Sequence, residues 1–155
     1  MNFLDKGDLL FPGGGPAPKS FHLAAFYGFF LGALIFTGYV NNAFICLFVT
    51  CSNYTLGNHG EIWQMWHAVG CSFLGSVNLL VAIDSDSSAF TKKGRAHLSY
   101  ATSAIYLTWG VQNTYYCIAY AGTLFTPGMW LNAIGCLVVG FFSLYTGLKL
   151  GGKLN

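Results

Sequence analysis

Two long stretches of this chain carry almost no charge, and this limits what it can fold into. Glu61 is the one charged residue between Lys19 and Asp84, and none lies between Arg95 and Lys149. Charged residues make up 8% of the 155 residues, against roughly a quarter in soluble domains. So few charges cannot cover a soluble surface, and the mean hydropathy of +0.53 agrees. The sequence predicts an integral membrane protein, and it excludes a conventional soluble enzyme and a nucleic-acid partner.

Each uncharged stretch is long enough for two membrane-spanning helices, since one crossing needs about 20 mostly apolar residues. We therefore expect an all-α, antiparallel bundle of four transmembrane helices, at residues 21–41, 61–83, 96–121 and 127–148. A polar, Gly/Pro-rich tail (1–20) precedes this four-span domain (21–150), and a short tail (151–155) follows it.

The punctuation of the sequence suggests where individual helices begin and end. Thr126 followed by Pro127 is typical of a capped helix start, and Gly151-Gly152 is typical of a helix end. The first apolar run continues to Val49, which is long for one span. We expect its helix to break near Gly38 and Asn41-Asn42, and a single long, tilted helix is the alternative.

The basic residues predict the orientation. All seven Lys and Arg lie in the two tails, the central loop or the helix ends beside them, and the loops 42–60 and 122–126 contain none. The positive-inside rule therefore places both termini on the basic side, which is the cytoplasm, matrix or stroma. No targeting peptide is recognisable in residues 1–20. We expect a multi-pass protein of an organellar energy-transducing membrane, the mitochondrial inner membrane or alternatively the thylakoid.

Three histidines are candidate axial ligands of a haem iron or a chlorophyll magnesium. His67 lies well within a predicted span, whereas His22 and His97 both lie at the basic ends of their spans. Two histidines at one depth are the arrangement of bis-His haem ligation. The alternative is that His22 and His97 occupy a polar interface and that His67 forms a hydrogen bond to a neighbouring helix. No HExxH or CxxC pattern predicts a metal site.

Aromatic and amide side chains gather in the half of the bundle away from the basic side. Such a set is typical of an interfacial aromatic belt with interhelical hydrogen bonds, or of a pocket for a quinone, sterol, pigment or lipid headgroup. The pocket candidates are Trp63, Gln64, Trp109, Gln112, Asn113, Trp130 and Asn132.

Small residues recur at helical spacing and predict close helix packing. Ala24, Gly28 and Gly32 form a stripe with a GxxxG step on the first span. Gly135, Ser143 and Gly147 form a looser stripe on the fourth. Both stripes suit packing within the bundle and docking on another subunit equally well.

The remaining reactive groups indicate no catalytic site. Cys46 and Cys51 could form a disulfide if the side away from the basic residues is oxidising. Asn53 begins a glycosylation sequon on that same side. No Ser–His–Asp or Cys–His set converges by depth, so we expect no enzyme.

Two short stretches carry a resemblance to a known family. The run Ala82-Ile83-Asp84 with its basic loop, and the helix end Gly147-Leu148-Lys149-Leu150, resemble a small four-helix scaffold family of sterol biosynthesis. The resemblance covers these stretches alone and implies a lipid- or sterol-handling scaffold.

The sequence thus leaves three functions open. The favoured one is a non-catalytic accessory subunit of a multi-subunit membrane complex, in electron transport of the respiratory chain ahead of a photosystem. The second is a pigment- or haem-binding subunit, and the third is the lipid- or sterol-handling scaffold. The expected partners are other membrane subunits and bound lipids; lipid, chlorophyll, carotenoid or haem are possible cofactors, none of them required by the sequence.

Overall fold

The computed structural model describes residues 19–40, 46–50, 58–84 and 89–154, and these form an all-helical membrane protein. The helices are α1 (Lys19–Val40), α3 (Asn58–Ile83), α4 (Lys92–Ala119) and α5 (Met129–Leu150). Three of them contain a segment long and apolar enough to cross a membrane, namely Lys19–Thr37, Gln64–Ile83 and Met129–Leu150. At 28 residues α4 is long enough to cross, but its composition is less apolar.

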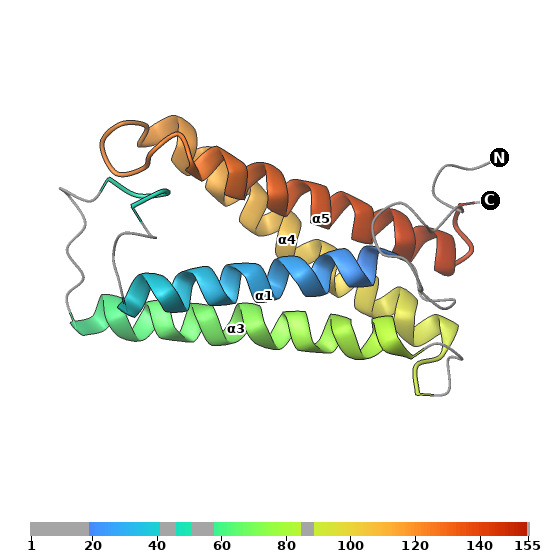
Figure 1. Ribbon diagram of the computed structural model, residues 1–155. Coiled ribbons are helices and arrows are strands. Elements are labelled where there is room, and N and C mark those ends of the chain that lie inside the picture. The colour runs from blue at the N-terminus through green and yellow to red at the C-terminus, as the bar shows by residue number, and fades with distance from the viewer. Residues whose placement is uncertain (1–18, 41–45, 51–57, 85–88, 155) are drawn as a thin grey trace.

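The four helices form two antiparallel hairpin-like pairs. Helix α1 packs along α3, α4 packs along α5, and a smaller interface between α1 and α5 joins the two pairs. Figure 1 shows that α1 begins, α3 ends, α4 begins and α5 ends at the same end of the bundle. The pairs diverge towards the opposite end, where the segment 46–50 lies between them.

Helices α1 and α3 approach at backbone distance because glycine faces glycine. A methyl group added to Gly28 would lie 2.8 Å from the carbonyl oxygen of Cys71 and 2.8 Å from the Cα of Gly75. One turn further along α1, a methyl group on Gly32 would overlap the side chain of Ser72. In lipid such close approach supplies the van der Waals contact that holds helices together. The stripe of Ala24, Gly28 and Gly32 therefore faces α3 and the core, where all three residues are buried.

Glycines on α5 and α4 receive large side chains from the facing helix. Gly140 contacts Leu107, Gly147 contacts the ring of Tyr100, and Gly110 of α4 contacts Leu137. Gly135 instead faces α1, where the phenol of Tyr27 fills the space that a Cβ would need. The small residues of α5 thus allow close packing against both α4 and α1.

Polar groups tie the two pairs together in the buried centre. Tyr106 of α4 is fully buried and donates a hydrogen bond to the carbonyl oxygen of Ala24 (3.3 Å). Asn78 of α3 donates to the hydroxyl of Thr102 of α4 (3.3 Å) and to the carbonyl oxygen of Leu74 (2.9 Å). Such interhelical bonds satisfy side chains that lipid could not.

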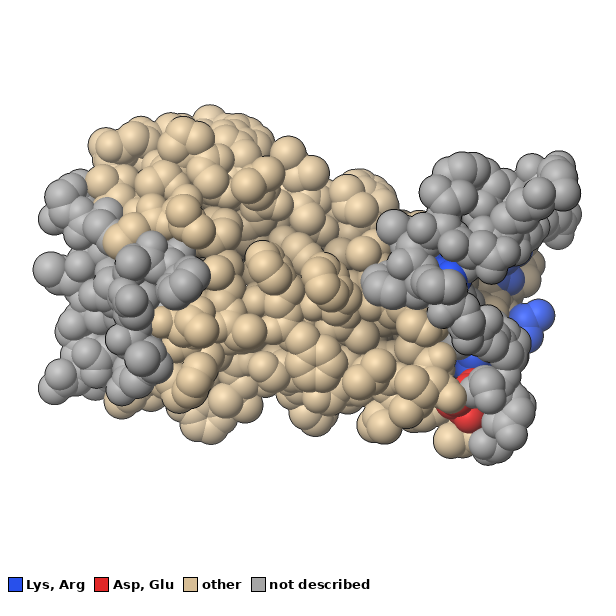
Figure 2. Space-filling model, in the orientation of Figure 1, with Lys and Arg blue, Asp and Glu red and all other residues tan. Residues whose placement is uncertain are grey.

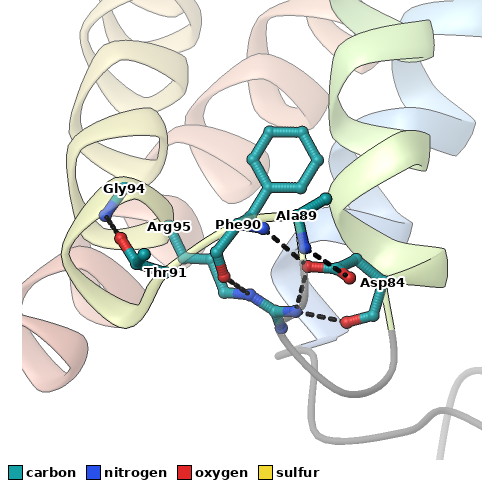
Figure 3. A network of polar contacts seen from close by, with 6 residues as sticks. All are labelled: Asp84, Ala89, Phe90, Thr91, Gly94 and Arg95. Atoms are coloured by element: carbon teal, nitrogen blue, oxygen red, sulfur yellow. Dashed lines mark hydrogen bonds and ion pairs between the residues drawn. The ribbon is translucent and has the colours of Figure 1, made fainter.

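A buried ion pair joins the end of α3 to the start of α4 (Figure 3). The guanidinium of Arg95 lies 2.9 Å from the carboxylate of Asp84, and the two side chains are 3% and 6% exposed. The same carboxylate accepts the backbone N–H groups of Ala89 (3.3 Å) and Phe90 (2.9 Å). Arg95 also donates to the carbonyl oxygens of Phe90 (3.1 Å) and Asp84. This network ties Asp84, just past the end of α3, to residues 89–95 at the start of α4.

The two ends of α5 differ from each other in how well the sequence predicts them. Gly152 adopts a φ of +69° and follows a helix that ends at Leu150. The hydrogen bonds from Lys153 N–H to the Leu148 carbonyl and from Gly152 N–H to the Lys149 carbonyl complete a Schellman-type end. The expected start at Thr126-Pro127 is wrong: α5 begins at Met129, because the Thr126 hydroxyl donates to the carbonyl oxygen of Leu47 instead of capping the helix.

The segment 46–50 lies against the loop between α4 and α5. Backbone hydrogen bonds join Thr50 N–H to the Leu124 carbonyl (2.9 Å) and Thr126 N–H to the Phe48 carbonyl (3.0 Å). The apolar run up to Val49 is therefore not one continuous helix, since α1 ends at Val40. Cys46, in this segment, is disulfide-bonded, while the other described cysteines, Cys71, Cys117 and Cys136, are free.

Candidate ligand cavity

A cavity of about 250 Å³ lies between the two hairpin-like pairs, in the half of the bundle away from the charged end. It forms where the pairs diverge, since α1, α3, α4 and α5 all contribute walls while the segment 46–50 and the α4–α5 loop cover it. The described residues that line it are Leu31, Leu34, Ile35, Phe48, Val49, His67, Trp109, Gln112, Asn113, Tyr116, Phe125, Met129, Asn132 and Cys136.

Aromatic rings make up much of the cavity wall. The rings of Tyr116 and Phe125 stack with their centroids 5.4 Å apart and an interplanar angle of 9°. The imidazole of His67 from α3 contacts the indole of Trp109 from α4, at 5.2 Å between centroids. Aromatic side chains therefore form part of the lining, which suits contact with a planar ring.

Amide groups from α4 and α5 converge on the same space. Among the described residues, the side-chain nitrogen of Asn113 donates only to the thiol of Cys136 (3.9 Å), and that of Asn132 only to the thioether of Met129 (4.0 Å). Sulfur is a weak acceptor, so both donors are poorly satisfied by the protein. The oxygen of Asn132 is better placed, because it accepts the Tyr27 hydroxyl at 3.0 Å.

His67 makes a ring contact but no hydrogen bond among the described residues. An imidazole in an apolar setting is costly to leave without hydrogen-bond partners. Its side chain is exposed, as is that of Gln112, whereas the other lining residues are buried or half-buried. The cavity therefore opens between α3 and α4, at His67 and Gln112.

The described lining residues include no Lys, Arg, Asp or Glu. The site therefore offers no counter-charge to a phosphate or carboxylate, and it suits an uncharged headgroup. Its volume lies below the roughly 300–1,000 Å³ of pockets for drug-sized ligands. A cavity of this size holds one substituted ring, and it does not enclose a tetrapyrrole.

Not all of the residues singled out from the sequence reach this cavity. His67, Trp109, Gln112, Asn113 and Asn132 line it. The other candidates are placed elsewhere: Gln64 is buried against α1 and donates to the Ile35 carbonyl (3.1 Å), Trp130 is exposed, and the side chain of Trp63 lies outside the described residues.

The remaining histidine candidates lie at the charged end. His22 is half-buried in the first turns of α1, and His97 is exposed on α4. Within the described ranges, no group of three or more His, Cys, Asp or Glu side chains could hold a metal ion.

Sequence reasoning missed the apolar part of the site. Leu31, Leu34 and Ile35 carry no distinguishing pattern within an apolar helix. Phe48 and Val49 join the cavity only because their segment folds back onto Leu124–Thr126, which no helical period reveals. The Asp84–Arg95 pair was visible only as part of a charged cluster, and its burial could not be read from the sequence.

The outward face of α4 differs from those of the other helices. Outward positions on α1 are rich in phenylalanine and those on α5 carry large apolar side chains, whereas the first half of α4 exposes mainly small and polar residues. Beside and beyond these, α4 also exposes Ile105, Val111, Tyr115 and Ile118. We call the small and polar part the α4 face and define it as His97, Ala101, Ala104 and Thr108.

No family model matches this chain, and neither does any curated protein or solved structure. Its function is therefore inferred from the packing, the cavity and the exposed faces.

Proposed function

We propose that this protein is a non-catalytic, four-span membrane subunit that docks through the α4 face on another membrane protein. The observation that carries the proposal is the contrast between outward faces. Phe26, Phe30 and Phe36 on α1 suit lipid, whereas His97 and Thr108 on α4 do not. Ala101 and Ala104 leave room for a second helix to approach closely.

The proposal requires α4 to cross the membrane although it is the least apolar helix. Its support is geometric: α4 packs antiparallel along α5, which is apolar enough to cross, and the ends of the two helices lie level (Figure 1). A helix of 28 residues extends about 42 Å at 1.5 Å per residue, enough for the hydrocarbon core. Partner contacts on the α4 face would shield its polar groups from lipid.

Charge supports placing both termini on one side. The described charged residues visible in Figure 2 gather at the end of the bundle where α1 begins and α5 ends. By the positive-inside rule this end faces the cytoplasm, matrix or stroma. The disulfide-bonded Cys46 lies at the opposite end, which fits an oxidising compartment there.

An energy-transducing membrane of an organelle, with the respiratory chain ahead of a photosystem, is the setting we propose for this subunit. The support is the lack of any extramembrane domain in the described chain together with a docking face of interhelical character. A single-ring cavity gives no specific support to a haem- or chlorophyll-binding role, so that role is not proposed here.

The test of docking is a pair of matched alanine-to-leucine variants. Ala104→Leu adds bulk to the α4 face, whereas Ala33→Leu adds the same bulk to the exposed face of α1. After solubilisation in mild detergent, wild type and Ala33→Leu should migrate in one large complex on native electrophoresis. Ala104→Leu should migrate as the free subunit, with an unchanged helical circular dichroism spectrum.

Two outcomes contradict the proposal. In the first, Ala104→Leu remains in the complex as fully as Ala33→Leu does. In the second, the wild-type protein extracted from its native membrane migrates alone, with no companion protein in the band by mass spectrometry.

A further inference from the structure

We propose that the cavity is a binding site for the ring of an uncharged quinone or quinol, whose alkyl tail leaves between α3 and α4 into the lipid. The site lies inside this chain, so the inference does not depend on docking through the α4 face. Four features of the cavity carry it: its polar groups, its lack of charge, its walls and its opening.

The polar groups match the two oxygens of such a ring. Asn113 and His67 reach the cavity from α4 and α3, and neither has a strong hydrogen-bond partner among the described residues. An amide and a neutral imidazole can each donate or accept a hydrogen bond. They can therefore bind a quinone carbonyl, which accepts, and equally a quinol hydroxyl, which donates.

The walls and volume select the shape of the ligand. Trp109, Tyr116 and Phe125 place aromatic side chains in the lining, where they can contact a planar ring. A cavity volume of about 250 Å³ accommodates one substituted ring. The four fused rings of a sterol exceed this volume, and so does a tetrapyrrole. The absence of Lys, Arg, Asp and Glu among the described lining residues disfavours fatty acids and phospholipid headgroups.

The opening explains how a lipid-soluble molecule would enter. The exposed lining residues are His67 of α3 and Gln112 of α4, and these helices belong to different hairpin-like pairs that diverge at this end (Figure 1). A ring can enter sideways from the bilayer through this gap. The tail then stays in lipid, so the cavity need not contain it.

The test uses decylubiquinone as the probe and the fluorescence of Trp109 as the readout. The full chain carries Trp63→Phe, Trp66→Phe and Trp130→Phe, which leaves Trp109 as its single tryptophan. In phosphatidylcholine nanodiscs the ester carbonyls of the lipid are already in large excess over the added quinone. A site specific for the quinone ring should still give quenching of Trp109 fluorescence that saturates at one quinone per chain.

Variants separate binding from simple partitioning into the bilayer. Asn113→Leu and His67→Leu should each weaken binding about tenfold, since each removes one hydrogen bond in an apolar site. His67→Gln, which keeps a donor and an acceptor, should bind within about threefold of wild type, so the test does not depend on the leucine variant folding. Ala119→Leu, on the same helix as Asn113 but outside both the cavity and the α4 face, should bind normally.

Three results overturn the inference. The first is quenching that rises in proportion to membrane quinone and is equal in wild type and Asn113→Leu, which means partitioning only. The second is displacement of the probe by excess cholesterol, which assigns the cavity to sterols. The third is displacement of the probe by oleate, which assigns the cavity to acyl chains.

Discussion

At the scale of single residues, the Asp84–Arg95 pair is the most consequential interaction at the charged end. Both side chains are almost fully buried, and the carboxylate also accepts two backbone N–H groups. Removing one member of such a pair leaves the other as an uncompensated buried charge. The pair therefore links the end of α3 to the start of α4, and disrupting it should cost far more free energy than disrupting a surface ion pair.

Replacing Arg95 by methionine should lower the free energy of unfolding by about 3–5 kcal/mol, because the Asp84 carboxylate loses its counter-ion. The control is Lys93→Met, an exposed position on the same helix, which should change stability by no more than about 0.5 kcal/mol. Thermal unfolding in one detergent measures both. Equal melting temperatures for the two variants would contradict the structural role of the ion pair.

At the scale of the helices, the interfaces are built from glycine facing backbone or large rings. Gly28 lies against the backbone of α3, whereas Gly70 of α3 has nothing within 4 Å of where its Cβ would lie. Two glycines in neighbouring helices thus have opposite roles. The first permits close approach, and the second occupies an open outward position.

Gly28→Ala should destabilise the bundle by about 1–3 kcal/mol, because the methyl group overlaps the backbone at Cys71 and Gly75. Gly70→Ala adds the same methyl group in open space and should be neutral or slightly stabilising, since alanine is the better helix former. Thermal denaturation of the two variants side by side provides the measurement. If Gly28→Ala melts with Gly70→Ala, the helices do not pack through this contact.

The helices could be predicted from the sequence, because long apolar runs bounded by charged residues indicate helical segments. Their observed bounds differ by a few residues from those expected, as at α5, where Thr126 binds Leu47 instead of capping the helix. Part of the cavity lining could also be predicted from the sequence, because Trp109, Asn113 and Asn132 lie at a similar depth in their helices. Phe48 and Val49 could not, because a fold-back of the chain brings them there.

At the scale of the whole molecule, the account depends on α4. Helices α1, α3 and α5 each contain a segment apolar enough to cross a membrane, whereas α4 is less apolar, exposes small and polar residues in its first half and packs along α5. If α4 crosses the membrane, both termini lie on the basic side and the α4 face is an interface within the membrane. The cavity then lies in the half of the bilayer away from the basic side.

The direct measurement is the labelling of Lys93→Cys and Thr123→Cys by a membrane-impermeant maleimide in sealed vesicles of known sidedness, with wild type as the blank for the native cysteines. These positions lie at the start of α4 and in the loop just after it. We predict that they react from opposite sides, with Lys93→Cys on the same side as Lys153→Cys. Reaction of Lys93→Cys and Thr123→Cys from the same side would contradict the four-span account.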